Sequence, residues 1–78
     1  MANALYKQLF TTVSAYIGEN KAKMSVGRQL DRCNATEDNL TKDHLRAVMI
    51  FLTAATTLHL YPDKDKQAEL TNQIKALV

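Results

Sequence analysis

The sequence predicts an all-α fold, either a small four-helix bundle or a compact orthogonal array of helices. Residues 45 to 61 place apolar side chains on two opposite faces of a helix, and two further segments show the apolar period of an amphipathic helix. No segment shows the sustained alternation that is typical of a strand. The connections are short, which favours antiparallel neighbours. We therefore expect a single helical domain over residues 1–78, with no linker that would divide it.

The first predicted helix runs from Ala4 to about Ile17. Its apolar residues fall within one arc of about 140° on a helical wheel, and polar residues lie opposite. Gly18 can adopt the left-handed conformation that commonly ends a helix. The apolar arc consists of Leu5, Tyr6, Leu9, Phe10, Val13, Tyr16 and Ile17.

A second, weaker helix is predicted from about residue 20 or 21 to Cys33, with a later start at Ser25, a good N-cap residue, as the alternative. Gly27 lowers its intrinsic stability by about 1 kcal/mol relative to alanine. The polar residues 34–39 that follow have the composition of a loop, and we expect Leu40 to pack against the core. The inward stripe of this helix consists of Ala22, Val26, Leu30 and Cys33.

The central apolar helix is predicted over about residues 42–61, with Thr41 as its N-cap and Pro62 as its stop. A membrane span needs about 20 mostly apolar residues, and polar residues interrupt this run, so we expect other helices on at least two of its sides. One apolar face carries Leu45, Val48, Met49, Leu52, Thr56 and His59. The second carries Ala47, Ile50, Phe51, Ala54, Leu58 and Tyr61.

The last predicted helix runs from Lys64 to about Leu77, with Asp63 as its N-cap. Apolar or amide side chains recur along it at helical spacing, which predicts one face that packs on the other helices. This face consists of Gln67, Leu70, Ile74 and Leu77.

A chain of 78 residues buries a limited share of its surface, so we expect marginal stability without further support. The single cysteine cannot form an internal disulfide, and no Cys/His group has zinc spacing. Self-association or docking on a partner is the remaining common support. The first ten residues lack the pattern of a secretory signal, which predicts a cytoplasmic protein without a transmembrane segment. The net charge of +2 is too small to indicate nucleic-acid binding by itself.

The sequence favours a non-enzymatic function without a cofactor or a metal. Cys33 lies on an inward stripe, His59 on an apolar face, and His44 in the first turn of the central helix, so none belongs to a catalytic set. There is no glycine-rich phosphate loop and no calcium-binding loop. We predict an interaction module that regulates, inhibits or adapts a larger protein, or self-associates. The predicted contact residues are Phe51, Leu58, Leu60 and Tyr61.

The second helix also predicts an alternative function, a regulator that binds nucleic acid. Its outward side carries cations that would form a ridge suited to phosphates or to an acidic protein. The residues of this ridge are Lys21, Arg28 and Arg32, with Lys23 nearby.

A further alternative comes from the second half of the chain. An apolar helix containing Thr53, Ala54 and Thr56 is followed by Tyr61, an acidic cap and an amphipathic helix with Leu70 and Ile74. This order resembles the last two bundle helices of pediocin-type bacteriocin immunity proteins. The resemblance covers less than half of the chain and does not extend to the C-terminal tail of that family. It implies a cytoplasmic protein that protects its host by binding a membrane-associated target.

Overall fold

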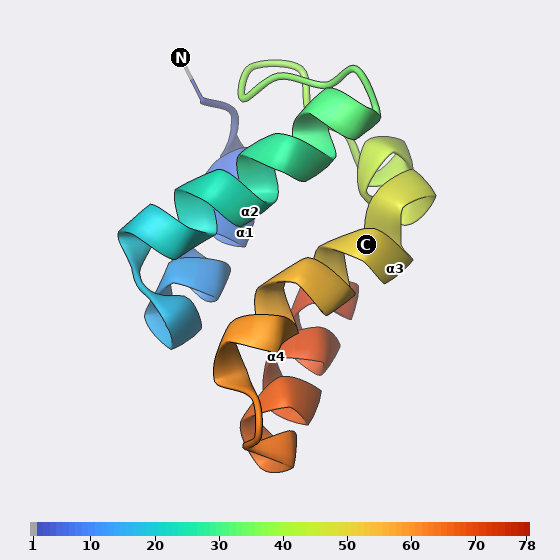
Figure 1. The fold of residues 1–78 in the computed structure, drawn as a ribbon. Helices are drawn as coiled ribbons and strands as arrows, with labels where there is room; N and C mark the ends of the chain where they lie inside the picture. The colour runs from blue at the N-terminus through green and yellow to red at the C-terminus, as the bar shows by residue number, and fades with distance from the viewer. Residues whose placement is uncertain (1) are drawn as a thin grey trace.

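The computed structural model describes residues 2–78 and consists of four α-helices and one short 3-10 helix (Figure 1). No strand occurs among these residues, so the predicted all-α fold is confirmed. The elements are α1 (Ala4–Ile17), α2 (Glu19–Arg32), α3 (Lys42–Thr57), η1 (Leu58–Leu60) and α4 (Lys64–Lys75).

The four helices form a closed ring in which each helix packs mainly on two neighbours, with a smaller contact between α1 and α3. α2 lies between α1 and α3, and α4 lies between α3 and α1. In the view of Figure 1, α1 lies behind α2 and α4 behind α3. The apolar side chains that point into the ring make one core, and the loop after α2 adds two of them. The fully buried large residues include Leu9, Val13, Val26, Leu45, Leu52, Leu70 and Ile74, and the loop contributes Ala35 and Leu40.

The junction between α1 and α2 is shorter than the sequence predicts. Gly18 has a φ of 87° and ends α1 as expected. α2 begins at Glu19, within one or two residues of the first predicted start, so the alternative start at Ser25 is wrong. The Gly18 carbonyl already accepts the Ala22 N–H at 3.0 Å, so the helix starts without a capping side chain. Ser25 is instead buried within α2, which ends at Arg32.

α3 begins where predicted and ends earlier. The Thr41 hydroxyl accepts the His44 backbone N–H at 3.2 Å, which confirms the N-cap. The α-helix stops at Thr57 rather than near Tyr61, and the Gln67 side chain donates to the Thr57 carbonyl at 3.0 Å. The Tyr61 N–H donates instead to Leu58, which gives the 3-10 turn of η1.

α4 begins where predicted and ends earlier than predicted. The Asp63 carboxylate accepts the Lys66 N–H at 3.0 Å, as expected of an N-cap. The helix ends at Lys75, two residues before the predicted Leu77. The Leu77 N–H bonds to the carbonyl of Ile74, three residues back, so the chain tightens beyond the last α-helical turn.

The two apolar faces of α3 have different surroundings. Leu45, Val48 and Leu52 on the first face are buried in the ring. Helices pack on two sides of α3, as predicted, but α2 and α4 both lie toward this inner face, because a ring of four leaves the outside of each helix open. The second face, which we call the outer face of α3, is therefore not covered within residues 2–78. It consists of Ala47, Ile50, Phe51, Ala54 and Leu58, all exposed.

None of the helices within residues 2–78 has the length and apolar character needed to cross a membrane.

Candidate functional site

The outer face of α3 carries large apolar side chains in contact with water. Ile50 is 80% exposed, Leu58 68% and Phe51 50%. Met24 on α2, at 60%, lines the same hollow as Leu58 and extends the apolar area, and Tyr61 after η1 is also exposed, at 72%. Single exposed apolar residues are ordinary on protein surfaces, whereas a cluster of large ones commonly marks an interaction site.

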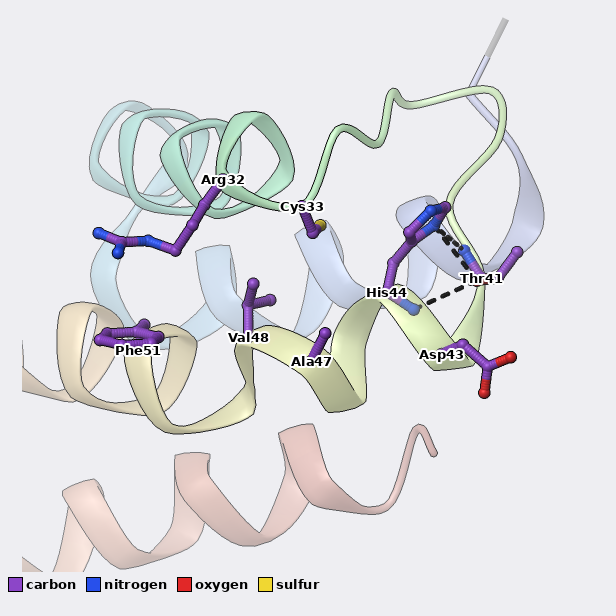
Figure 2. A pocket seen from close by; sticks show the side chains of 8 residues that line it. All are labelled: Arg32, Cys33, Thr41, Asp43, His44, Ala47, Val48 and Phe51. Atoms are coloured by element: carbon purple, nitrogen blue, oxygen red, sulfur yellow. Dashed lines mark hydrogen bonds between the residues drawn. The ribbon is translucent and has the colours of Figure 1, made fainter.

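The side chains of α2 and α3 meet along one seam at the surface. The Arg32 guanidinium lies over the Phe51 ring, 4.4 Å from the ring centroid (Figure 2). Further along the seam, Met24 and Arg28 of α2 line the same hollow as Leu58. We call the residues Met24, Arg28, Arg32, Phe51 and Leu58 the seam surface.

Two hollows lie along this seam, one toward each end. The larger, of about 750 Å³, opens between the end of α2 and the first turns of α3 (Figure 2). It is lined by Arg32, Cys33, Thr41, Asp43, His44, Ala47, Val48 and Phe51. The smaller, of about 210 Å³, is lined by Met24, Ser25, Arg28, Ala55, Leu58 and His59. Arg32 and Phe51 lie at the border of the larger hollow, so the seam continues from one to the other.

The predicted basic ridge contains three cations rather than four. Along the observed helix, Lys21, Arg28 and Arg32 fall within an arc of about 40°, whereas Lys23 lies about 180° from Arg32. All four side chains are exposed, and none forms an ion pair within residues 2–78. The cations therefore border the apolar seam without a carboxylate to neutralise them.

The structure brings together residues that the sequence assigned to two separate sites. Phe51 and Leu58, predicted to contact a partner, lie beside Arg28 and Arg32, predicted to contact phosphate or an acidic surface. Leu60 does not join them, because it is partly buried and packs against the core.

Tyr61 is exposed but follows η1 rather than continuing the helical face. Met24 and Ile50 are exposed apolar residues that do not belong to the predicted contacts. Met24 lies one turn before Arg28 on the same side of α2, and Ile50 was already on the second face of the predicted helix. Helical spacing alone therefore places Met24 beside Arg28 and Ile50 beside the predicted contacts.

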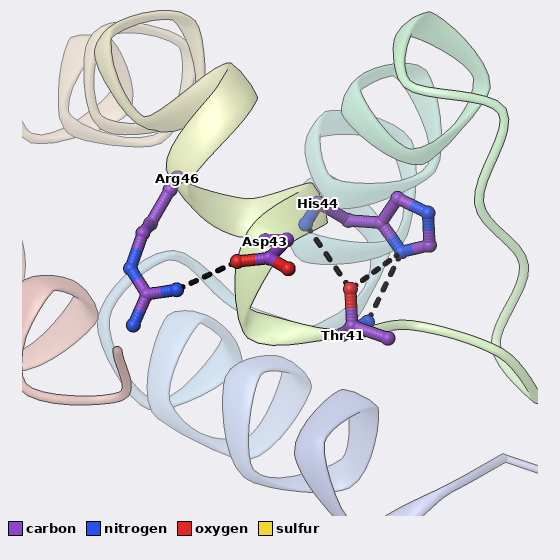
Figure 3. A network of polar contacts seen from close by, with 4 residues as sticks. All are labelled: Thr41, Asp43, His44 and Arg46. Atoms are coloured by element: carbon purple, nitrogen blue, oxygen red, sulfur yellow. Dashed lines mark hydrogen bonds and ion pairs between the residues drawn. The ribbon is translucent and has the colours of Figure 1, made fainter.

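Polar groups at the start of α3 serve the helix end (Figure 3). His44 Nδ1 accepts the Thr41 backbone N–H at 3.1 Å, while Thr41 Oγ1 accepts the His44 N–H, so each residue caps the other. Asp43 Oδ1 lies 2.8 Å from Arg46 Nη1. The Cys33 thiol, partly buried, donates to the Gln29 carbonyl at 3.3 Å. These contacts give His44 and Cys33 structural partners in the backbone.

Two polar side chains that line the smaller hollow, Ser25 and His59, lie close together. Ser25 is buried, and its Oγ lies 3.5 Å from Nε2 of the exposed His59. One turn along α2, the Gln29 Oε1 atom is buried without a hydrogen-bond partner within the described chain. No group of three or more His, Cys, Asp or Glu side chains in residues 2–78 is arranged to hold a metal ion.

We found no match to the chain among protein-family models, curated proteins or solved structures.

Proposed function

We propose that the protein is a non-enzymatic interaction module that docks on a larger protein through the outer face of α3 and the adjoining seam surface, and so regulates or blocks it. The supporting observation is the contrast within α3, where Leu52 is fully buried and Ile50, two residues away, is 80% exposed. An apolar face of this size costs free energy in water, and a partner that covers it recovers about 25 cal/mol for each Å² of apolar surface buried.

The polar residues support docking rather than chemistry. His44 and Cys33 are bonded to the backbone at a helix end, so neither is held against a base or an acid that would activate it. Our proposal includes a cytoplasmic location, with which the unpaired thiol of Cys33 agrees.

Binding of nucleic acid has weaker support. The cationic ridge is reduced to Lys21, Arg28 and Arg32, and apolar side chains border it throughout the seam. A surface that tracks a phosphate backbone combines cations with hydrogen-bond donors or stacking aromatics, and here Arg32 already occupies one face of the Phe51 ring.

Site-specific photo-crosslinking tests the proposal. Benzoylphenylalanine replaces Leu58 on the outer face or, as the control, Asn72, an exposed residue on the outside of α4. Both proteins are irradiated in a lysate of the source organism. We expect a discrete adduct from position 58 that is absent from position 72. Equal labelling at the two positions, or no adduct at position 58, would contradict docking through this face.

A further inference from the structure

We propose that the occupant of the seam surface is an amphipathic helix of a partner protein, with apolar side chains on one face and acidic residues along the edge that meets α2. This inference rests on the proposed docking function and adds the chemistry of the partner. It follows from three features of the seam, namely its length, its hollows and its charge.

The seam has the length of a short helix. It extends along α3 from Ala47, in the larger hollow, to Leu58, in the smaller one. This separation of eleven residues corresponds to about 16 Å at the rise of an α-helix, or three turns. A helix that lies in a groove inserts side chains at spacings of three, four and seven residues, so three turns supply anchors for both hollows.

The hollows accept apolar side chains. Met24 and Leu58 form the exposed walls of the smaller hollow, and its volume of about 210 Å³ suits one large side chain. Met24 can adjust to the shape of that side chain, since an unbranched thioether has several accessible rotamers. Phe51, Ala47 and Val48 give the larger hollow an apolar side of the same kind.

The charge of the seam selects an acidic edge. Arg28 and Arg32 have no carboxylate partner within residues 2–78, and Lys21 continues their line along α2. The one carboxylate that lines either hollow, Asp43, is already paired with Arg46 at 2.8 Å. The stacking of Arg32 on Phe51 holds its guanidinium at the edge of the seam. There it can donate two parallel hydrogen bonds to one carboxylate.

The same charge disfavours a second copy of the chain as the occupant. A two-fold contact centred on the seam would place Arg28 and Arg32 of one copy near the same residues of the other. Like charges brought together at an interface oppose association, whereas Asp or Glu on a partner helix would neutralise these cations.

Selection from a displayed library of helical peptides tests the inference. The bait is the whole chain, and peptides that also bind the Leu58→Asp variant are discarded. We expect the enriched peptides to combine apolar residues at helical spacing with a net negative charge. The binding of a fluorescein-labelled enriched peptide is then measured by anisotropy, and we expect it to weaken about tenfold on the double substitution Arg28→Gln and Arg32→Gln.

A matched control removes two cations elsewhere. Lys64→Gln with Lys75→Gln, both exposed on α4, lowers the net charge equally and should leave the affinity within about twofold, since exposed charges beyond a Debye length are screened. Circular dichroism of each bait confirms that the helices remain folded.

Other outcomes would overturn the inference. Enriched peptides that need Leu58 but are neutral or basic, or that bind equally after loss of both arginines, would leave docking intact and exclude the acidic helix. A labelled oligonucleotide that depends on Arg28 and Arg32, without any acidic peptide, would assign the seam to nucleic acid. A dimer in sedimentation that dissociates on Leu58→Asp would assign it to a second copy. Failure to enrich any peptide would reject the inference about the acidic helix. Photo-crosslinking at position 58 tests the proposed docking function independently of that result.

Discussion

The inner and outer faces of α3 contain side chains of the same kind in opposite surroundings. Leu45, Leu52 and Val48 are buried on one side, while Ile50 and Leu58 are exposed on the other. Hydropathy alone does not distinguish the two faces. What separates them is position, because the core covers the inner face, whereas α2 reaches the outer face only along its edge, where Arg32 lies over Phe51. The outer face also has the cations Arg28 and Arg32 beside it. One face thus serves folding, and the other is available for a partner.

Truncation of one side chain on each face should have very different effects on stability. Leu52→Ala removes fully buried carbon atoms and should lower the free energy of unfolding by about 2–5 kcal/mol. Ile50→Ala removes carbon atoms that are already in water and should change it by no more than about 0.5 kcal/mol. Urea unfolding followed by circular dichroism measures both. Equal losses for the two variants would mean that the outer face is packed against something in the folded protein.

Both faces belong to α3, so the contribution of its N-terminal cap to the free energy of unfolding is the next quantity to measure. Thr41→Ala removes the acceptor of the His44 N–H and should cost about 1 kcal/mol of unfolding free energy. Lys42→Ala, at the next exposed position, contributes no capping bond and is the control. If the two variants melt at the same temperature, the reciprocal cap does not stabilise the helix.

The contact between Arg32 and Phe51 is the link from α2 to the outer face. A double-mutant cycle with Arg32→Gln and Phe51→Leu should give a coupling free energy of about 0.5–1 kcal/mol, in the range of partly exposed cation–π pairs. The matched cycle with Arg28→Gln in place of Arg32→Gln should give a coupling near zero, since within residues 2–78 the cation over the Phe51 ring is Arg32. A coupling of the same size in both cycles would point to general charge effects.

The smallest expected effect on stability at neutral pH concerns Tyr6 on α1. Burial raises the pKa of the Tyr6 phenol above its ordinary value, and a hydrogen bond and the negative charge of Glu37 add to the shift. Because the folded state favours the protonated phenol, its contribution is complete below the unfolded pKa of about 10 and is lost as the pH rises through the folded pKa.

Wild type should therefore lose stability relative to Tyr6→Phe as the pH rises above about 10. Tyr61→Phe, at an exposed position, is the control and should follow wild type. Thermal unfolding at a series of alkaline pH values measures the difference. A constant difference between Tyr6→Phe and wild type over the whole range would contradict the linkage.

Much of the fold follows from local signals in the sequence. Thr41 and Asp63 cap the helices that they were predicted to cap, and Gly18 ends α1, because each acts on its own turn. The end of α3 could not be predicted in this way. There the Thr57 carbonyl accepts from the Gln67 side chain, a bond between two different helices that the spacing within one helix does not contain.

The candidate site was predicted in parts. Helical spacing separated Phe51 and Leu58 from the inner face and aligned Arg28 with Arg32. That the two groups adjoin is a property of how α2 packs on α3, which helical spacing within one element does not contain. Leu60, also predicted as a contact, is partly buried against the core in η1, which the spacing of a continuous helix does not indicate.

The most direct test of the two-face account is the affinity of the photo-crosslinked partner for variants of each face. We expect Leu58→Asp to keep the helical circular dichroism and urea midpoint of wild type while binding to the partner falls below detection. Leu52→Ala, measured at a temperature where it is folded, should bind nearly as well as wild type. Full binding by a folded Leu58→Asp variant would contradict the assignment of the outer face to a partner.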